Sequence, residues 1–251
     1  MSHVAAPAHR RRRLRRTLAC AVVATAAWLA LGAVAPATGL ACSAAEFIGV
    51  RGSGEDYNTN YGMGATIKGV YDRLARHVPK GKKLQRYGLD YPAVAIDWQA
   101  PAYFWSVGTG KSNLENRLHS DASACPTMKF VISGFSQGAH VVGDAIEELT
   151  RNNDGVVSHI AGVAIYGDPR FSKDDTATAR GDYDPNHWGT LGARGNYSSQ
   201  INDRLGDWCR IRDAICQGFN AGDTASHEYI QYLGGLFLDQ GEALMQSHLG
   251  W

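Results

Sequence analysis

The stretch from residue 128 to residue 149 constrains the fold of this chain more than any other. Met128 to Ser133 is an apolar run with the length of a buried strand. A glycine-rich turn, Gly134-Phe135-Ser136-Gln137-Gly138, follows it directly. One face of a helix then comes from Val141, Val142, Ala145, Ile146 and Leu149. A strand that passes through a tight turn into an amphipathic helix is typical of a parallel α/β unit.

The same alternation continues along the chain. Further strands are predicted at 46–50, 84–91 and 160–166, and the polar segment 181–199 indicates a long surface loop. Helical faces are formed by Ile67, Val70, Tyr71, Leu74 and Val78, and near the end by Ile230, Leu233, Leu236 and Phe237. We therefore expect an α/β fold of the α/β-hydrolase type, a three-layer sandwich with a central, mostly parallel sheet and helices on both faces.

Ser136 stands at the centre of a Gly-x-Ser-x-Gly motif, which is common by chance. Its context, a strand before and a helix after, is the one that a nucleophile elbow requires. Side chains at positions 134 and 138 would collide with the neighbouring backbone, and the helix start places N–H groups beside the hydroxyl. We interpret Ser136 as a nucleophile rather than as a helix-capping serine.

A serine nucleophile needs a histidine base, and in elbow enzymes this base follows the acid in the chain. The histidines after Ser136 are His140, His159, His187, His227 and His248. His140 suits a packing role on the elbow helix, and His159 begins a strand at the wrong end of the sheet. His187, on the long loop, stays open as an alternative. We favour His227, because a loop before the last helix can carry it over the sheet edge.

The orienting acid has several candidates ahead of His227: Asp168, Asp182, Asp184, Asp203, Asp207, Asp213 and Asp223. Asp213 is distinguished by the cysteines at 209 and 216 that bracket it, because a disulfide there would hold the loop rigid. Asp168, in Gly167-Asp168-Pro169, fits a turn or a cap equally well. We therefore expect Asp213 to be the acid.

The N-terminus has the pattern of an export signal. Arginines at positions 10–13, 15 and 16 precede an apolar run from Leu18 to Val34 and the small residues Ala35-Pro36-Ala37. We expect a signal peptide at 1–37, with an approximate cleavage position, and a single catalytic domain at 38–251. A retained membrane anchor is the alternative. Without its six arginines the Lys+Arg count falls from 25 to 19 against 24 Asp+Glu, a net charge near −5, and we expect no nucleic-acid partner.

The cysteines are consistent with export. Cys20 leaves with the signal, and four remain: Cys42, Cys125, Cys209 and Cys216. The close pair Cys209 and Cys216 suggests a local loop, which leaves Cys42 to pair with Cys125. A zinc site is the rival interpretation, but no paired C-x-x-C spacing supports it.

Taken together, these residues resemble the cutinase family of serine esterases, which includes acetylxylan esterases and actinobacterial cutinase-like proteins. The resemblance rests on elements that occur in order: Arg51-Gly52-Ser53, Tyr91-Pro92-Ala93, Ser106-Val107 with Gly110 at a helix start, Cys125-Pro126, the elbow, Gly167-Asp168-Pro169 and Cys209-x₃-Asp213-x₂-Cys216. It implies Ser136, Asp213 and His227 as the catalytic triad and both cysteine pairings. It also implies an oxyanion hole at the N–H of Gln137 and at Ser53.

Two positions depart from the family pattern. Arg212 stands where glycine often precedes the aspartate, and Tyr229 follows the histidine at the second position instead of the third. These departures affect the expected loop geometry and remove no catalytic residue.

The resemblance implies a secreted, monomeric carboxylic ester hydrolase that needs no metal and no organic cofactor. Its ester substrate would be a lipid, a polyester such as cutin or an acetylated polysaccharide, with short to medium acyl chains. Deacetylation of a polysaccharide such as xylan is the alternative activity, and an inactive wall- or glycan-binding protein is a rival from another class. The aromatic residues Tyr103, Phe104, Trp105 and Trp188 could line an apolar substrate surface or belong to the core. No stable membrane insertion is expected after signal cleavage.

Overall fold

The computed structural model describes residues 42–95, 101–228, 232 and 235–251. The predicted signal peptide at 1–37 lies outside the described residues. So do Tyr229 and two residues of the expected final helical face, Ile230 and Leu233. Among the described residues, no helix is both long enough and apolar enough to cross a bilayer.

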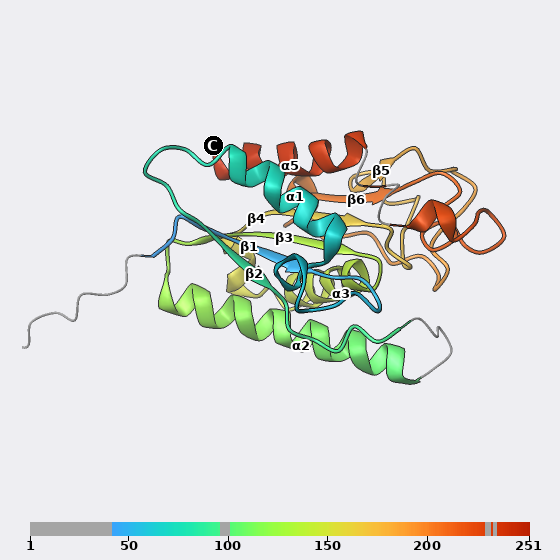
Figure 1. Ribbon diagram of the computed structural model, residues 1–251, viewed down its shortest axis with the longest axis horizontal. Helices are drawn as coiled ribbons and strands as arrows, with labels where there is room; N and C mark the ends of the chain where they lie inside the picture. Colours follow the sequence, from blue (N-terminus) through green and yellow to red (C-terminus); the bar gives the residue numbers. More distant parts are fainter. Residues whose placement is uncertain (1–41, 96–100, 229–231, 233–234) are drawn as a thin grey trace, which may run out of the picture. The chain divides into compact units, whose positions relative to one another are not determined.

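Six parallel strands form one sheet (Figure 1), in the order β2-β1-β3-β4-β6-β5. Their bounds are β1 Ala45–Val50, β2 Leu84–Gly88, β3 Lys129–Phe135, β4 Ile160–Tyr166, β5 Ala179–Gly181 and β6 Leu205–Cys209. The order reverses at β1, so strands are added on both sides of it, as in doubly wound sheets. The expected α/β class is confirmed, and the sheet is parallel throughout.

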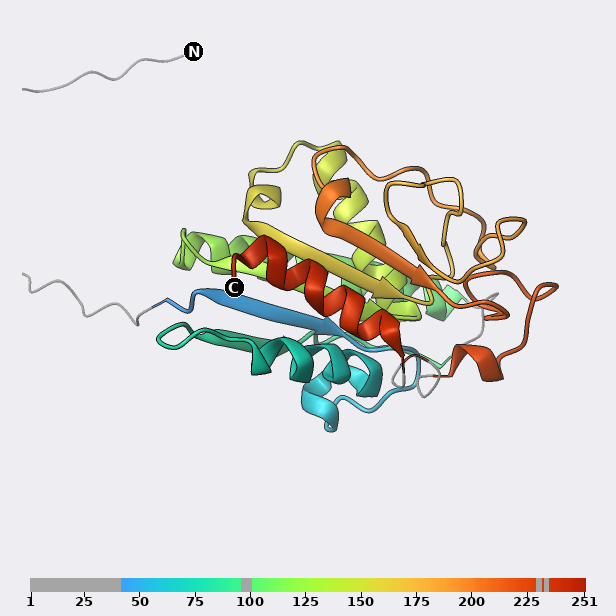
Figure 2. The ribbon, with the colours of Figure 1, turned by 90° about the horizontal axis from the view of Figure 1, so that it is seen from above.

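Within the described part of the chain, helices cover both faces of the sheet (Figures 1 and 2). The pair α1 Gly64–Arg76 and α5 Leu236–Leu249 covers one face, and the pair α2 Pro101–Ala124 and α3 Gln137–Arg151 covers the other. The described residues also form short 3₁₀ helices: η1 Asn60–Gly62, η2 Gly155–His159, η3 Asn202–Arg204 and η4 Ala225–His227. The three layers match the predicted sandwich.

The core divides at the sheet, as the period of two in a strand requires. On β1, Phe47 packs under α1 and α5, whereas its neighbour Ile48 packs under α2 and α3. On β3, Val131 and Ile132 divide in the same way. Because the central strands are buried on both faces, they read in the sequence as continuous apolar runs, as expected for a parallel sheet.

Four elements differ from the sequence-based expectation. The strand predicted at 84–91 ends at Gly88, and neither the edge strand β5 nor its neighbour β6 was predicted. The fourth is α2, which spans 24 residues and was expected only from the family resemblance around Ser106. Its buried face includes Ser106 and Gly110, which interrupt the apolar stripe that would have revealed it.

Both predicted disulfides are present. Cys42 is joined to Cys125 and Cys209 to Cys216, with Cα–Cα distances of 5.7 Å and 5.8 Å. The first ties the start of β1 to the end of α2. The second closes a loop of a few residues directly after β6. These two bonds use all four cysteines that the rival zinc interpretation would need as ligands. Among the described residues there is no group of three or more His, Cys, Asp or Glu that could hold a metal ion.

Candidate active site

Ser136 lies on the sharp turn between β3 and α3, with φ 56° and ψ −119°. This conformation is rare for a residue with a side chain and is held by the surrounding backbone. A Cβ atom on Gly134 would lie 2.4 Å from the Gly138 carbonyl oxygen, and one on Gly138 would lie 2.1 Å from the Val50 carbonyl oxygen. The two motif glycines therefore allow the strand, the turn and the helix to pack together.

The structure brings His227 into contact with Ser136. The Nε2 atom of His227 lies 2.8 Å from Ser136 Oγ, although the residues are 91 positions apart. The imidazole stacks on the ring of Phe135, the residue before the serine, with centroids 4.9 Å apart. A side chain on Gly167 would collide with the same imidazole, because its Cβ would lie 2.8 Å from Cε1. The ring is thus held between the elbow and the turn after β4.

Asp213 lies on the other side of the imidazole. Both carboxylate oxygens are 2.9 Å from His227 Nδ1, and the aspartate is fully buried. The carboxylate also accepts a hydrogen bond from Ile215 N–H at 2.8 Å and a longer one from Cys216 N–H at 3.4 Å. Burying a carboxylate costs free energy unless hydrogen-bond donors replace the lost water. The disulfide-closed loop provides them from its own backbone.

Asp223 joins the loop of Asp213 to the turn of His227. Its N–H donates to the Arg212 carbonyl at 2.8 Å, and its carboxylate accepts from Ser226 N–H at 2.8 Å, at the start of the turn that carries His227. This backbone hydrogen bond is the largest cause of a lowered pKa of Asp223. Asp223, one of the candidate acids, therefore fixes the two loops instead of contacting the imidazole.

The departure at Arg212 has a simple geometry. Its φ is 66°, in the left-handed region where glycine is favoured, which explains why glycine is common before the aspartate. Arg212 adopts this conformation although it carries a side chain. Its guanidinium forms an ion pair with Asp223 at 3.0 Å on the surface.

Tyr232 is a site residue that the sequence analysis missed. Its buried hydroxyl donates a hydrogen bond to Oδ2 of Asp213 and accepts one from Arg210 N–H at 3.2 Å. Burial, together with the adjacent Asp213 carboxylate, holds the pKa of Tyr232 well above its usual range, so the hydroxyl stays a donor. The sequence carries no local signal for this role, because the contact joins residues 19 positions apart.

A cleft of about 300 Å³ opens beside Ser136 and His227. It is lined by Gly52, Ser53, Glu55, Phe135, Ser136, Ile215, Thr224, His227 and Glu228. The Ser53 hydroxyl is buried and has no hydrogen-bond partner within the described part of the chain. Gln137 is the first residue of α3, so its N–H has no carbonyl four residues earlier within the helix. Both predicted oxyanion donors thus lie next to Ser136 or in the lining of its cleft.

The loop of Ser53 is rigidly held. The Glu55 carboxylate accepts hydrogen bonds from Gly52 N–H at 2.6 Å and from Ala65 N–H at 2.9 Å, which joins the loop to α1. The buried Arg51 guanidinium donates to the carbonyls of Leu89 and of Tyr91. The oxygens and N–H groups of this loop therefore have fixed positions relative to Ser136.

The other candidate bases lie elsewhere. His140 is buried in α3 with Nδ1 3.1 Å from the Tyr103 hydroxyl, and His159 directly precedes β4 at the opposite end of the sheet. His248 lies in α5 at that same end, in a shallow hollow with Ile160. His187 belongs to a separate hollow beside Trp188.

Asp168 also has a different setting from the predicted acid. Its carboxylate accepts from Arg170 N–H at 2.9 Å and from the buried Arg194 guanidinium at 2.9 Å. This pair ties the long 181–199 loop to the turn after β4.

The aromatic residues named from the sequence divide into two groups. Tyr103 is fully buried and belongs to the core. Phe104, Trp105 and Trp188 are more than half exposed, at 51%, 61% and 51%. Of these, only Trp188 lines a hollow that we describe below.

Comparison with known proteins places this chain in a family. The Cutinase family model matches residues 41–235. Phospholipase Culp4 of Mycobacterium tuberculosis is 29% identical over 161 residues, which cover 61% of this chain and 65% of that relative, slightly less than two thirds of its length. Cutinase CUT1 of Coprinopsis cinerea is 28% identical over 203 residues, covering 77% of this chain and 85% of that protein.

Solved structures share the fold. An acetyl xylan esterase superposes with a TM-score of 0.68 at 21% identity, covering 83% of this chain and all of that one. A cutinase-like protein from Cryptococcus sp. gives 0.63 at 20% identity, covering 85% and 98%. Since the family model spans most of the chain, the chain belongs to the Cutinase family.

Proposed function

We propose that the protein is a secreted serine esterase in which Ser136, His227 and Asp213 form the catalytic triad. The observation that carries the proposal is the continuous chain of contacts from Ser136 Oγ to His227 Nε2 at 2.8 Å and from His227 Nδ1 to Asp213 at 2.9 Å. Ser136 and His227 are 91 positions apart in the sequence, and with Asp213 they meet in the order that acyl transfer requires.

In this mechanism Ser136 Oγ attacks the ester carbonyl while His227 Nε2 takes its proton. The imidazolium is stabilised by Asp213 and then gives the proton to the departing alcohol, which leaves an acyl group on Ser136. A water molecule attacks the acyl-enzyme with His227 again as the base, and the carboxylic acid leaves. The hydroxyl of Tyr232 keeps Asp213 oriented through both steps.

The developing oxyanion would be bound by the N–H of Gln137 and by Ser53. The unpartnered buried hydroxyl of Ser53 supports this role, because such a group costs free energy unless a ligand supplies an acceptor. The backbone N–H at the start of α3 adds the positive end of the helix dipole.

The cleft is consistent with esters of short to medium acyl chains. Phe135 and Ile215 supply apolar wall, and the volume of about 300 Å³ is at the lower end for ligand pockets. Polyesters such as cutin, lipids and acetylated polysaccharides all present such acyl groups.

We further propose export of a mature domain that begins near residue 38 and acts as a monomer. Two disulfides that use all four cysteines after position 37 support an oxidising compartment. Mass spectrometry of the protein from the culture medium would identify the first residue, and an intact N-terminus in a membrane fraction would instead favour an anchor.

Turnover of a chromogenic acetyl or butyryl ester by the parent protein and by Ser136→Ala tests the proposal. We expect hydrolysis by the parent and a loss of at least about 10⁴-fold in the variant. Equal rates in the two proteins would refute the assignment of Ser136. No hydrolysis by the parent of any ester in a chain-length series would favour the inactive binding protein.

A further inference from the structure

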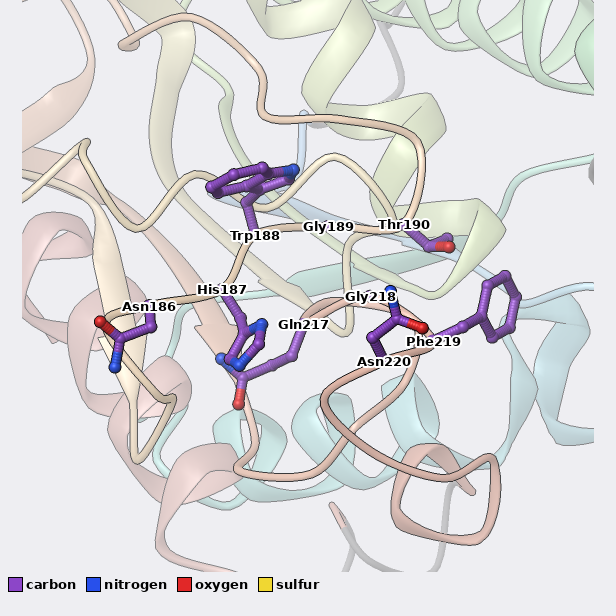
Figure 3. A pocket seen from close by; sticks show the side chains of 9 residues that line it. All are labelled: Asn186, His187, Trp188, Gly189, Thr190, Gln217, Gly218, Phe219 and Asn220. Atoms are coloured by element: carbon purple, nitrogen blue, oxygen red, sulfur yellow. The ribbon is translucent and has the colours of Figure 1, made fainter.

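A second hollow, of about 420 Å³, lies beside the proposed catalytic cleft. It is formed by two loop segments, 186–190 and 217–220, which face each other in Figure 3. Thr190 N–H, from the first segment, donates to the carbonyl of Ile215 at 2.9 Å, and Ile215 lines the catalytic cleft. Ile215 therefore lines the catalytic cleft, and Gln217, two residues later, lines the second hollow.

The hollow carries two half-exposed aromatic rings. Trp188 comes from one segment and Phe219 from the other, with 51% and 54% of their surfaces exposed. Both rings therefore keep large apolar surfaces in contact with solvent. Aromatic side chains that remain exposed within one hollow are a common feature of binding sites.

The frame of the hollow is fixed before any ligand arrives. Gln217 is buried, and its amide both accepts from Asp184 N–H and donates to the Asp184 carbonyl, each at 3.1 Å. Gly189 N–H donates to the Phe171 carbonyl at 3.0 Å, and a Cβ on Gly189 would lie 2.2 Å from the Pro169 carbonyl oxygen. A ligand would therefore bind to an ordered surface, and the entropy cost of ordering the loops on binding would be small.

The remaining lining is polar and almost free of charge. The described residues that line the hollow are Asn186, His187, Trp188, Gly189, Thr190, Gln217, Gly218, Phe219 and Asn220, and none of them is Lys, Arg, Asp or Glu. Phosphate or carboxylate ligands would require cationic partners. An acyl chain would require a continuous apolar wall, but amide and hydroxyl groups lie between Trp188 and Phe219 in Figure 3.

A neutral sugar has the chemistry that this lining matches. Its ring has an apolar C–H face for an indole or phenyl ring, and its hydroxyls both donate and accept, as do the amides of Asn186 and Asn220. We propose that the hollow is a subsite for a neutral oligosaccharide. Resting on the proposed function, it would hold the glycan of an acylated polysaccharide while an acyl group on a neighbouring unit lies at Ser136.

Binding without turnover tests the subsite directly. The Ser136→Ala protein is titrated with xylohexaose, which carries no ester, by calorimetry. We expect binding that weakens at least about tenfold when Trp188→Ala is added, and that also weakens with Phe219→Ala. Trp105→Ala is the matched control, because this tryptophan is 61% exposed on α2 and lies outside the hollow, and it should bind as the parent does. No binding of xylohexaose, or equal binding by Trp188→Ala, would overturn the proposal.

Turnover separates this proposal from the proposed function. In otherwise unmodified protein, Trp188→Ala should lower the kcat/KM for acetylated xylohexaose about tenfold relative to that for p-nitrophenyl acetate, mainly through KM. Trp105→Ala should leave this ratio unchanged. Binding of xylohexaose without hydrolysis of either ester would refute the proposed function and support the subsite. Hydrolysis of both esters with an unaltered ratio in Trp188→Ala would refute the subsite alone.

Discussion

Replacing Tyr232 by phenylalanine tests whether the environment of Asp213 governs the reaction. The substitution removes one hydroxyl and keeps the ring, which packs edge-on against Phe135 at 5.6 Å. Asp213 would keep the N–H donors of Ile215 and Cys216 and its contact with His227, and would lose the donor at Oδ2.

The magnitude follows from the kind of hydrogen bond that is lost. A hydrogen bond to a charged group contributes about 1.5–3 kcal/mol, so the free energy of unfolding should fall by about 2 kcal/mol. The carboxylate then has more freedom to rotate away from the imidazole. If about 1.4 kcal/mol of the lost interaction is felt in the transition state, kcat falls about tenfold.

Steady-state kinetics on a soluble acetyl ester, together with urea unfolding, measures both effects. Tyr166→Phe is the control, because Tyr166 is equally buried and its hydroxyl meets the Phe237 carbonyl at 3.4 Å instead of Asp213. We expect the control to keep its kcat. Full activity in Tyr232→Phe would show that the hydroxyl does not position Asp213, and an equal loss in both variants would assign the effect to packing.

Three further predictions concern other parts of the structure. The double variant Cys209→Ala with Cys216→Ala should remain folded by circular dichroism, at a cost of about 2.5 kcal/mol for so short a loop, but should lose most of its kcat; full activity would show that other contacts hold the loop. Ser53→Ala should lower kcat by up to about 10²-fold with an unchanged melting temperature, and an unaltered kcat would exclude a role for the hydroxyl. Burial raises the pKa of Glu46 to about 7 despite its ion pair with Arg117. Because the folded state binds this proton more tightly than the unfolded state, the contribution of Glu46 to the free energy of unfolding is fully present below pH 4.5 and is lost as the pH rises through 7. Thermal melts should therefore show a fall in stability between pH 5 and pH 8 that is smaller in Glu46→Gln, and identical pH profiles would contradict it.

The local parts of the fold were predictable from the sequence because their signals are local. The strand predicted at 160–166 has the bounds of β4, and the apolar run, glycine turn and helical face at 128–149 became β3, the elbow and α3. In each case the residues that determine the strand, turn or helix lie within the same short segment of the sequence.

Elements defined by tertiary packing were not predictable in this way. A Cβ on Gly110 of α2 would lie 2.8 Å from a methyl group of Val141, so the helices approach through a glycine at a position where a periodicity argument looks for a large apolar residue. In β6, Gly206 and Asp207 are buried, so the strand lacks the apolar run by which a buried strand is predicted from sequence. The side chain of Trp208 fills the space over Gly206, since a Cβ there would lie 2.3 Å from the indole.

The candidate site shows the same division. Ser136 could be named from its motif, and Asp213 and His227 from chain order, the flanking cysteines and the family resemblance. Tyr232 could not, because its role depends on a contact with a residue 19 positions earlier that only the folded chain reveals.

The central claim is that Ser136 is the nucleophile, and covalent trapping tests it most directly. A p-nitrophenyl alkylphosphonate transfers its phosphonyl group to an activated serine and releases p-nitrophenolate. We predict one equivalent of p-nitrophenolate per protein, complete loss of esterase activity and a single adduct on the peptide that contains Ser136. The adduct should not form in Ser136→Ala, and it should form much more slowly in His227→Ala, because the base would be missing. An adduct on another residue, or inactivation of the ester hydrolysis without an adduct at Ser136, would contradict the account.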